Sequence, residues 1–274
     1  MARSVEDLRV LIRGAGEMAS GIALRLRQCH MLVVMTEVAM PTAVRRTVAF
    51  AEAIYEGVQD LEGVRAFKVC TSSDVEDAWS NGVIPLLVDP GAEIKDAIRP
   101  DVVVDAIMAK KATDTCIADA PLVVGVGPGF TAGENVHAVV ESNRGYDLGK
   151  VIWQGSAEPY TGVPATVAGH AQARVFRTPA AGRFKALRQI GDVVEKGETV
   201  AHVNGVSIDA QIDGLIRGML RDGIDVSAGV KAGDIDPRRE RGYCYSVSDK
   251  ARAIGGGVLE AILHFFYDPR ALHS

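Results

Sequence analysis

The sequence lacks the features that mark several broad classes of protein. Its formal net charge is −5, and no stripe of basic residues interleaved with aromatic ones is present, so it shows no electrostatic signature of nucleic-acid binding. Its apolar runs, such as residues 121–126, are far shorter than the roughly 20 residues that span a bilayer, and charged residues rather than an apolar core follow Met1. We therefore predict a cytoplasmic protein that binds neither nucleic acid nor membranes.

Closely spaced cysteines are also missing. The four cysteines are widely separated, form no C-x-x-C motif and are accompanied by no histidine cluster with metal-ligand spacing. We therefore predict no metal site and interpret the cysteines as small buried residues or free thiols. Thiol chemistry stays open for Cys116 and Cys244, whose sequence surroundings are polar. The sequence designates no catalytic residue.

Glycines, by contrast, mark a first candidate site near the amino terminus. An apolar strand over residues 8–13 leads into a turn of the Rossmann form G-x-G-x-x-A. In such a turn the first glycine permits the tight bend, the second lets the backbone approach a pyrophosphate, and the alanine allows close packing of helix on strand. The following helix N-terminus would bind the anion. The predicted cofactor-binding residues here are Arg13, Gly14, Gly16, Glu17, Met18 and Ala19; the alternative is a turn used only for packing.

Glu37 and Arg45 extend this candidate site. Glu37 ends a predicted strand, and its distance along the chain from Gly16 is close to the spacing at which such folds place an acid on a ribose hydroxyl. A helix is predicted over residues 41–55, with Pro41 at its start and the pair Arg45 and Arg46 in its first turns. Either arginine could clamp a phosphate, although a solvated charged helix face explains the pair equally well.

The first half of the chain alternates apolar strands with helical segments. Strands are predicted near 8–13, 31–37, 84–89, 101–107 and 121–127, and helices near 17–29, 41–55 and 73–81. This order is typical of a doubly wound parallel sheet, which binds ligands beyond the carboxyl ends of its strands. Asp105 ends one strand, and a second glycine loop follows another. In that loop an anion nest is predicted at Gly127, Gly129, Phe130 and Thr131, the alternative being a compact turn.

A tandem repeat occupies the region between Thr178 and Asp236. Gly182, Gly191 and Gly197 recur at one constant offset as Gly214, Gly223 and Gly229. Apolar positions correspond as well (Phe184 with Ile216, Leu187 with Met219, Val194 with Val226, Val203 with Ile235), so each copy is expected to be a β-rich unit that buries the same face. Between the copies, Asn204-Gly205 flanked by valines predicts a type I′ hairpin.

This repeat resembles the biotinyl/lipoyl carrier fold, a flattened β-sandwich of two similar halves (a barrel-sandwich hybrid). Residues 190–200 match the "GDxVxxGxxV" run of that fold. However, a carrier domain presents its modified lysine at the tip of the central hairpin, and residues 202–207 contain no lysine. We therefore predict a carrier-shaped scaffold or docking module without covalent biotin or lipoate.

The predicted fold class is thus α/β, with a Rossmann-like parallel sheet domain followed by a small all-β biotinyl/lipoyl-like domain. The predicted boundaries place a nucleotide- or cofactor-binding domain at 1–155, a linker dense in helix breakers at 156–174, the β domain at 175–236, and a C-terminal segment at 237–274 whose helix packs back on the first domain.

Six segments together resemble one family, the accessory proteins of selenium-dependent molybdenum hydroxylases of YqeB type. They are residues 12–21, 45–48, 102–110, 127–133, 155–159 and 248–257. The resemblance covers nearly the whole chain, and the set is more specific than any single glycine motif. The family commonly has glycine in place of Ala15 and aspartate in place of Glu17. The resemblance implies a role in maturing a molybdenum hydroxylase, and it supplies no catalytic residues.

The leading hypothesis is an accessory or maturation factor that binds a nucleotide, such as NAD or CTP, or the molybdenum pterin cofactor, with the hydroxylase as client enzyme. An NAD-dependent oxidoreductase is the first alternative, although no Tyr-x-x-x-Lys motif or histidine–carboxylate set follows the glycine turn. A non-enzymatic protein-docking module is the second. The oligomeric state stays open, including a homo-oligomer.

Overall fold

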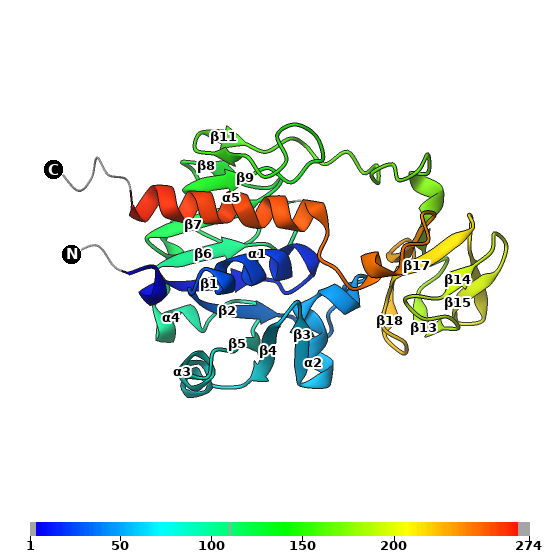
Figure 1. The fold of residues 1–274 in the computed structure, drawn as a ribbon, viewed down its shortest axis with the longest axis horizontal. Helices are drawn as coiled ribbons and strands as arrows, with labels where there is room; N and C mark the ends of the chain where they lie inside the picture. The colour runs from blue at the N-terminus through cyan, green and yellow to red at the C-terminus, as the bar shows by residue number, and fades with distance from the viewer. Residues whose placement is uncertain (1–3, 110, 268–274) are drawn as a thin grey trace. The chain divides into compact units, whose positions relative to one another are not determined.

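The structure is a computed structural model that describes residues 4–109 and 111–267 (Figure 1). Lys110, which belongs to one of the family segments, lies outside the described residues. The chain divides into two compact units. The first unit comprises the residues up to Pro41, Phe50–Tyr160 and the residues from Val247 onward; the second comprises Thr42–Ala49 and Thr161–Ser246. None of the helices in residues 4–109 and 111–267 combines the length and apolar character needed to cross a membrane.

The first unit is built on a nine-stranded mixed sheet in the order β10-β9-β7-β6-β1-β2-β5-β4-β3. Its strands are β1 (Arg9–Arg13), β2 (Leu32–Glu37), β3 (Val58–Leu61), β4 (Val64–Val69), β5 (Ile84–Val88), β6 (Val102–Asp105), β7 (Leu122–Val126), β9 (Ala138–Val140) and β10 (Val151–Ile152). The central strands are parallel, whereas β3 with β4 and β9 with β10 are antiparallel. A separate pair is formed by β8 (Thr131–Ala132) and β11 (Gly155–Ser156).

The helices of this unit are α1 (Glu17–Gln28), α2 (Ala53–Glu56), α3 (Ser72–Ser80), α4 (Lys95–Ile98) and α5 (Asp249–Phe266), with 3-10 turns η1 (Val5–Asp7), η3 (Phe50–Glu52) and η4 (Ile117–Asp119). Two of them begin at side-chain caps. Thr71 and Asp74 form a capping box at α3, and the Ser248 hydroxyl accepts the Ala251 N–H at the start of α5. The chain therefore encodes where these helices start.

The strands predicted at β1, β2, β5, β6 and β7 are confirmed within two residues at either end, and so are α1 and α3. The helix predicted over 41–55 is wrong: only short turns and the four-residue α2 form there. The N–H of Phe50 donates to the Ser20 hydroxyl at 2.8 Å, and the N–H of Ala51 donates to the Ala15 carbonyl at 2.9 Å. These tertiary hydrogen bonds replace the ones a continuous helix would make.

The predicted Rossmann-like parallel sheet is also wrong. The β3–β4 hairpin, turning at Glu62 and Gly63 with φ of +47° and +81°, adds an antiparallel edge. At the opposite edge, β9 leads into the antiparallel strand β10. The sheet is therefore mixed. The β3–β4 edge is mostly exposed, and β9 and β10 have only three and two residues, so neither edge forms a long apolar run in the sequence.

The second unit contains two four-stranded sheets, with orders β12-β19-β17-β14 and β16-β15-β13-β18. All their strand pairs are antiparallel. The strands are β12 (Val175–Arg177), β13 (Gly182–Ala186), β14 (Val193–Val194), β15 (Thr199–Val203), β16 (Val206–Asp209), β17 (Gly214–Met219), β18 (Asp225–Val226) and β19 (Lys231–Asp236); 3-10 turns are η2 (Arg46–Val48), η5 (Gln172–Arg174) and η6 (Arg241–Cys244). The predicted biotinyl/lipoyl-like class is corrected to this arrangement of two antiparallel sheets.

The tandem repeat itself is confirmed in the hydrogen bonds. The N–H of Gly191 donates to the Ile216 carbonyl, and at the matching position of the second copy the N–H of Gly223 donates to the carbonyl of Phe184, both at 2.8 Å. Asn204 and Gly205, with φ of +48° and +81°, form the predicted two-residue turn between β15 and β16. One predicted correspondence is only partly right, because Met219 is buried whereas its counterpart Leu187 is 47% exposed.

Glycines bring α5 close to α1 in the first unit, and the two helices lie side by side (Figure 1). A Cβ on Gly255 would lie 2.9 Å from the Gly21 carbonyl oxygen. A Cβ on Gly257 would lie 2.1 Å from the carbonyl oxygen of Gly149, a contact that real Cβ atoms do not make. Gly256 faces open space instead. Two of the three consecutive glycines are therefore needed for packing.

We predict opposite effects for alanine at two neighbouring positions. Gly257→Ala should lower the free energy of unfolding by about 1–3 kcal/mol, because the Gly149 backbone must move. Gly256→Ala, the matched control, should leave it unchanged or raise it by up to about 1 kcal/mol, because alanine is the better helix former. Urea titration of both variants measures this; equal effects would contradict the packing argument.

Candidate functional site

The carboxyl ends of the central parallel strands meet at one edge of the first sheet. Arg13 is the last residue of β1 and pairs in register with Asp105, the last residue of β6. Gly14 follows directly, and its N–H donates to the carbonyl of Thr36 in β2 at 2.8 Å. The topology therefore brings together three of the predicted site segments: the glycine turn, Asp105 and Glu37.

Arg13 and Asp105 form the centre of a buried polar network. Their side chains are 4% and 1% exposed, with 3.9 Å between Nη1 and Oδ2. The Arg13 guanidinium donates to Asp114 at 2.6 Å, to the Thr115 hydroxyl at 2.5 Å and to the Pro90 carbonyl at 3.0 Å. The Arg13 Nε is buried and finds no hydrogen-bond partner within residues 4–109 and 111–267.

The Asp105 carboxylate is fully occupied by neighbours in sequence. Oδ1 accepts the N–H of Ile107 at 3.1 Å, and Oδ2 accepts the hydroxyls of Thr113 and Thr115, each at 2.7 Å. Such bonds satisfy a carboxylate that would otherwise be costly to bury. The network therefore fixes the loop at residues 113–115 against the end of β1. The sequence analysis missed Thr113, Asp114 and Thr115; their only local signal is a short polar run soon after Asp105.

The glycine turn joins β1 to α1. Gly14 has φ +92°, a conformation that L side chains rarely adopt, and a Cβ there would lie 3.1 Å from the Ala106 carbonyl oxygen. Glu37 holds the turn: its Oε2 accepts the N–H of Ala15 at 2.9 Å and its Oε1 accepts the N–H of Val38 at 2.8 Å. Glu37 thus stabilises the turn through main-chain hydrogen bonds. The sequence analysis predicted only that Glu37 would bind a ribose hydroxyl.

Gly16 differs from Gly14. It is the N-cap residue of α1, with φ −66° and ψ −179°, an extended conformation open to any residue. A Cβ at Gly16 would meet no protein atom within 4 Å. No side chain caps α1, whose first turn holds Glu17, Met18 and the buried Ala19. The dipole of such a helix start favours an anion.

The second glycine loop has a different character. A Cβ on Gly127 would lie 2.3 Å from Ser142 Oγ, and one on Gly129 would lie 2.6 Å from the Lys111 carbonyl oxygen. Phe130 is buried against the backbone of Gly125. The N–H of Gly127 donates to the Val140 carbonyl, and that of Thr131 to the side chain of Asn135. Close packing and internal bonds therefore account for these residues, and the anion nest stays a prediction.

Arg45 lies in the second unit, in the segment that was predicted to be helical. It is 4% exposed, and its Nη2 donates to the carbonyls of Tyr243 at 2.9 Å and Ser246 at 3.3 Å. Its neighbour Arg46 donates from Nε to the carbonyl of Met219 at 2.9 Å. Both guanidinium groups thus bind backbone carbonyls inside the second unit, and the structure does not bring them together with Arg13 or Asp105 in one unit.

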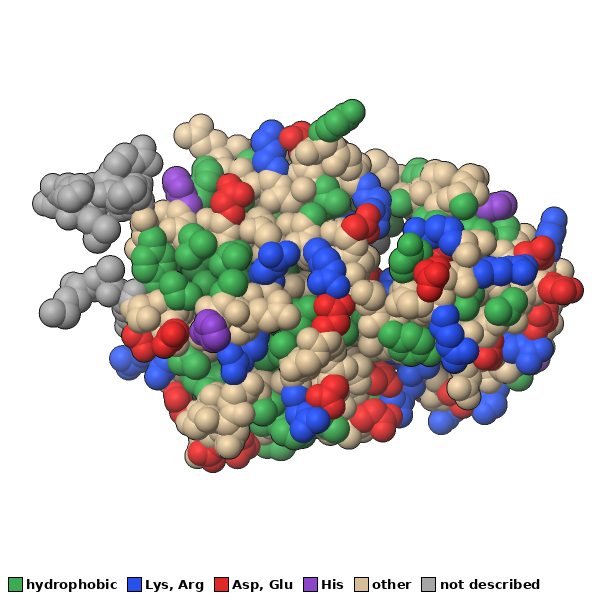
Figure 2. Space-filling model, viewed as in Figure 1, with side chains coloured by type: hydrophobic (Ala, Val, Ile, Leu, Met, Phe, Trp, Pro, Cys, Tyr) green, Lys and Arg blue, Asp and Glu red, His purple; other side chains and the backbone are tan. Residues whose placement is uncertain are grey.

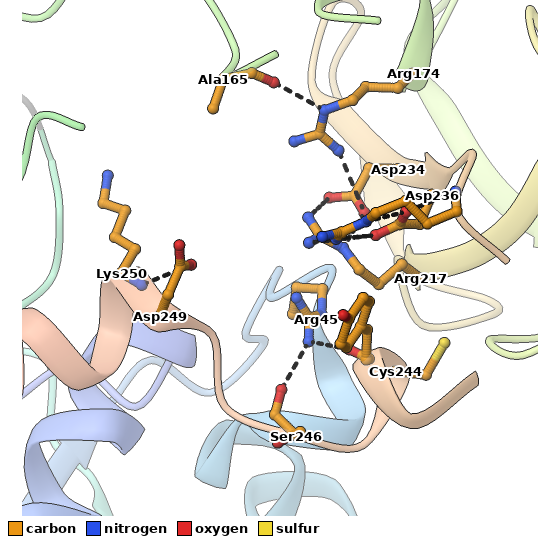
Figure 3. Close-up of polar contacts among 12 residues, drawn as sticks. Arg45, Ala165, Arg174, Arg217, Asp234, Asp236, Cys244, Ser246, Asp249 and Lys250 are labelled. Carbon is orange, nitrogen blue, oxygen red and sulfur yellow. Dashed lines mark hydrogen bonds and ion pairs between the residues drawn. The ribbon is translucent and has the colours of Figure 1, made fainter. Parts of the chain in front are cut away.

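A buried ionic cluster, also missed by the sequence analysis, joins Arg217 of β17 to Asp234 and Asp236 of β19 (Figure 3). The Asp234 side chain is 1% exposed; Arg217 Nε donates to it at 2.9 Å and Lys231 Nζ at 2.9 Å, while Arg174 lies at 3.8 Å. Asp236, equally buried, accepts hydrogen bonds from Arg238 at 2.6 and 2.9 Å. Its local signal is the set of charged residues Lys231, Asp234 and Asp236 within one short strand.

Burial alone would raise the pKa of Asp234, but the positive charges of Lys231, Arg217 and Arg174 outweigh it, so the net pKa lies well below 3.8. The same balance of burial against Arg238 and Arg217 lowers the pKa of Asp236. Both carboxylates stay ionised at neutral pH and complete a charge cluster inside the second unit.

We predict that Asp234→Asn lowers the free energy of unfolding at pH 7 by about 3–5 kcal/mol, because buried arginines lose their counter-charge. A carboxylate whose folded-state pKa is depressed stabilises the fold above the unfolded value near 3.8, and this contribution is lost as the pH falls below it. The variant should therefore lose less further stability than the wild type between pH 5 and pH 2.

Asp60→Asn is the control. Asp60 pairs with Arg65 at 2.7 Å, but both side chains are more than half exposed. Chemical unfolding at several pH values should show Asp60→Asn close to the wild type throughout. If the free energy of unfolding fell equally steeply between pH 5 and pH 2 in the wild type and in Asp234→Asn, the assigned role of the cluster would be contradicted.

The described residues contain no group of three or more His, Cys, Asp or Glu side chains placed to hold a metal ion. The four cysteines are free thiols, of which Cys244 is buried and Cys116 exposed. Burial raises the pKa of the Cys244 thiol despite the nearby Arg45 and Arg217. The Cys244 thiol is therefore protonated at neutral pH.

The comparisons with known proteins give one related sequence and several distant folds. No protein-family model matches the chain. Similar solved structures are an aspartoacylase family protein from Mesorhizobium loti (11% identity, TM-score 0.28, covering 84% of this chain and 85% of that one) and a succinylglutamate desuccinylase from a Silicibacter species (14% identity, TM-score 0.25, covering 84% of each). At these TM-scores the likeness carries no argument about the fold or the activity of this chain.

The uncharacterized protein YqeB of Escherichia coli K12 is 48% identical to this chain over 254 residues. The match covers 93% of this chain and 47% of YqeB, so the chain spans about half the length of the curated relative it matches. This similarity supports a YqeB-type family for the chain.

Proposed function

We propose that the first unit binds a nucleotide or the molybdenum pterin cofactor at the start of α1, and that the protein is an accessory factor in the maturation of a selenium-dependent molybdenum hydroxylase. The observation that carries the binding proposal is Gly16. Its backbone conformation is open to any residue, and a Cβ would meet nothing within 4 Å. The fold therefore gives no reason for glycine there, whereas a phosphate lying against the backbone does.

The donors available to such a phosphate are those of the first turn of α1. The N–H of Ala15 is already used by Glu37, and the N–H of Ser20 donates to the Gly16 carbonyl. No side chain caps this helix start, and the helix dipole there favours negative charge. Both a nucleotide and a pterin cofactor carry phosphate, so this geometry fits either.

The maturation role rests on similarity of sequence. The six segments that resemble the YqeB-type accessory proteins include the glycine turn, and the chain is 48% identical to YqeB over 254 residues. Under this proposal the protein holds the cofactor or a nucleotide for a client hydroxylase and need not make or break a bond itself.

The first test is calorimetric titration of the protein with NAD, CTP, ATP and isolated molybdopterin cofactor, repeated on Gly16→Ala and Gly16→Trp. We expect one of these ligands to bind the wild type. The added Cβ should weaken binding about tenfold, and the indole should abolish it, because the phosphate must approach the backbone. Gly256→Ala is the matched control, since that glycine also faces open space but lies in α5.

Thermal unfolding shows whether a variant loses binding because the site is altered or because the fold is destabilised. Gly16→Ala should unfold at or above the wild-type temperature, because no contact is lost and the unfolded chain is less flexible. No binding by any ligand, or equal weakening by Gly256→Ala, would overturn the proposed site. Steady NADH turnover with small carbonyl substrates would point to an oxidoreductase, and capture of a hydroxylase that is unchanged in Gly16→Trp would point to a docking module.

A further inference from the structure

The two copies of the repeat in the second unit present outer faces that differ. The first-copy face carries Arg183, Lys185, Leu187 and His202. The second-copy face carries Leu215, Arg217 and Asp234, which are the counterparts of Arg183, Lys185 and His202 at the repeat offset. Lys185 and His202 are direct cross-strand partners on β13 and β15, so they lie next to one another. The inward residues of the copies, Phe184 and Ile216, are both fully buried.

The second-copy face is covered by this chain. The N–H of Met219 donates to the Val44 carbonyl at 2.7 Å, and the Cys244 thiol donates to the Ile216 carbonyl at 3.6 Å. Leu215 is buried on this face, whereas the bulge after Ile216 turns Met219 into the hydrophobic core. The corresponding first-copy face has no such cover among the described residues, and Leu187 is 47% exposed.

A cavity of about 410 Å³ opens on the first-copy face. Its lining includes Arg183, Lys185, His202, Asn204 and Asp222. This volume lies within the range of about 300–1,000 Å³ that is usual for small-molecule sites. Over the part of the second unit that Figure 2 shows, Lys and Arg side chains alternate with Asp and Glu side chains. The excess of cations over acids in this cavity is therefore a local feature.

The copies also differ in charge. In the second copy, Arg217 is neutralised by Asp234 at 2.9 Å. In the first copy the counterpart of Asp234 is His202. The position therefore carries an imidazole, which is either neutral or positive, in place of a carboxylate. Lys185 is paired with Asp222 at 3.0 Å, which leaves Arg183 and His202 in excess. The first copy lacks the anion that the second copy supplies from its own chain.

His202 gives an independent sign of a missing partner. Its Nδ1 is a buried atom with no hydrogen-bond partner among residues 4–109 and 111–267. A buried polar atom left without a partner costs about 1–3 kcal/mol. A ligand oxygen that accepts from Nδ1–H would remove that cost, and it would lie beside Lys185.

We propose that this cavity is a binding site for a small anion with a phosphate or carboxylate group, held by Arg183, Lys185 and the Nδ1–H of His202. The anion takes the place that the Asp234 carboxylate occupies in the second copy. The inference concerns the second unit alone and does not rest on the function proposed for the first unit, so either can fail without the other.

The test is an NMR titration of the full chain, following the His202 ring signals, with inorganic phosphate and separately with succinate at constant ionic strength. We expect saturable shifts with at least one probe, because the bound anion would accept a hydrogen bond from the His202 ring. Saturation with phosphate alone assigns a phosphoryl ligand, and saturation with succinate alone assigns a carboxylate.

Three variants give effects of different sign. Lys185→Gln should weaken binding about five- to tenfold, because one charged donor is lost. Asp222→Asn should strengthen it several-fold, since it removes the competing carboxylate yet keeps an oxygen for the Ala186 N–H at 2.8 Å. Lys196→Gln, an exposed lysine in the turn after β14, is the control and should change nothing.

Two results would overturn the proposal. One is the absence of saturable shifts with both probes up to about 10 mM, which would leave no specific affinity. The other is an equal loss in Lys185→Gln and Lys196→Gln, or no gain in Asp222→Asn, because either pattern would mean that the probes sense only the overall charge of the protein.

Discussion

A buried charge needs a partner, and both units of this protein are organised around that requirement. In the first unit, Arg13 and Asp105 end neighbouring strands and are almost fully buried, so the loop at residues 113–115 must close over them with its hydroxyls and carboxylate. In the second unit, Asp234 imposes the same demand on arginines from separate segments. Because leaving one partner unpaired costs several kcal/mol, these pairs select a single arrangement of the loops around them.

This requirement also explains which parts of the fold the sequence predicts. The strands β1, β2, β5, β6 and β7 are runs of valine, isoleucine and leucine with few polar interruptions, so their burial is evident from the sequence. The tandem glycines and the Asn204-Gly205 turn are equally clear, because positive φ restricts the residue type. The β3–β4 hairpin was missed since its strands are short and mostly exposed.

The site was predicted less completely than the fold. The glycine turn and Asp105 can be found from spacing, since both follow apolar strands. The partners of Arg13 cannot, because Asp114 and Thr115 lie about a hundred residues away in sequence and meet it only through the sheet order. Similarly, Arg45 and Arg46 looked like part of a helix, but their carbonyl acceptors come from residues near 219 and 243–246. The conformations of Arg13, Arg45 and Arg46 depend on hydrogen bonds to residues that are distant in sequence, and a local sequence pattern cannot predict such partners.

The strand orders of the second unit have a consequence for how it is made. Strands β12 to β15 belong to the first copy and β16 to β19 to the second, and each sheet takes two strands from each copy. Neither sheet can therefore form while the chain is being synthesised until the second copy has left the ribosome. The glycines and apolar residues of the first copy therefore find their full set of partners only when β19 becomes available.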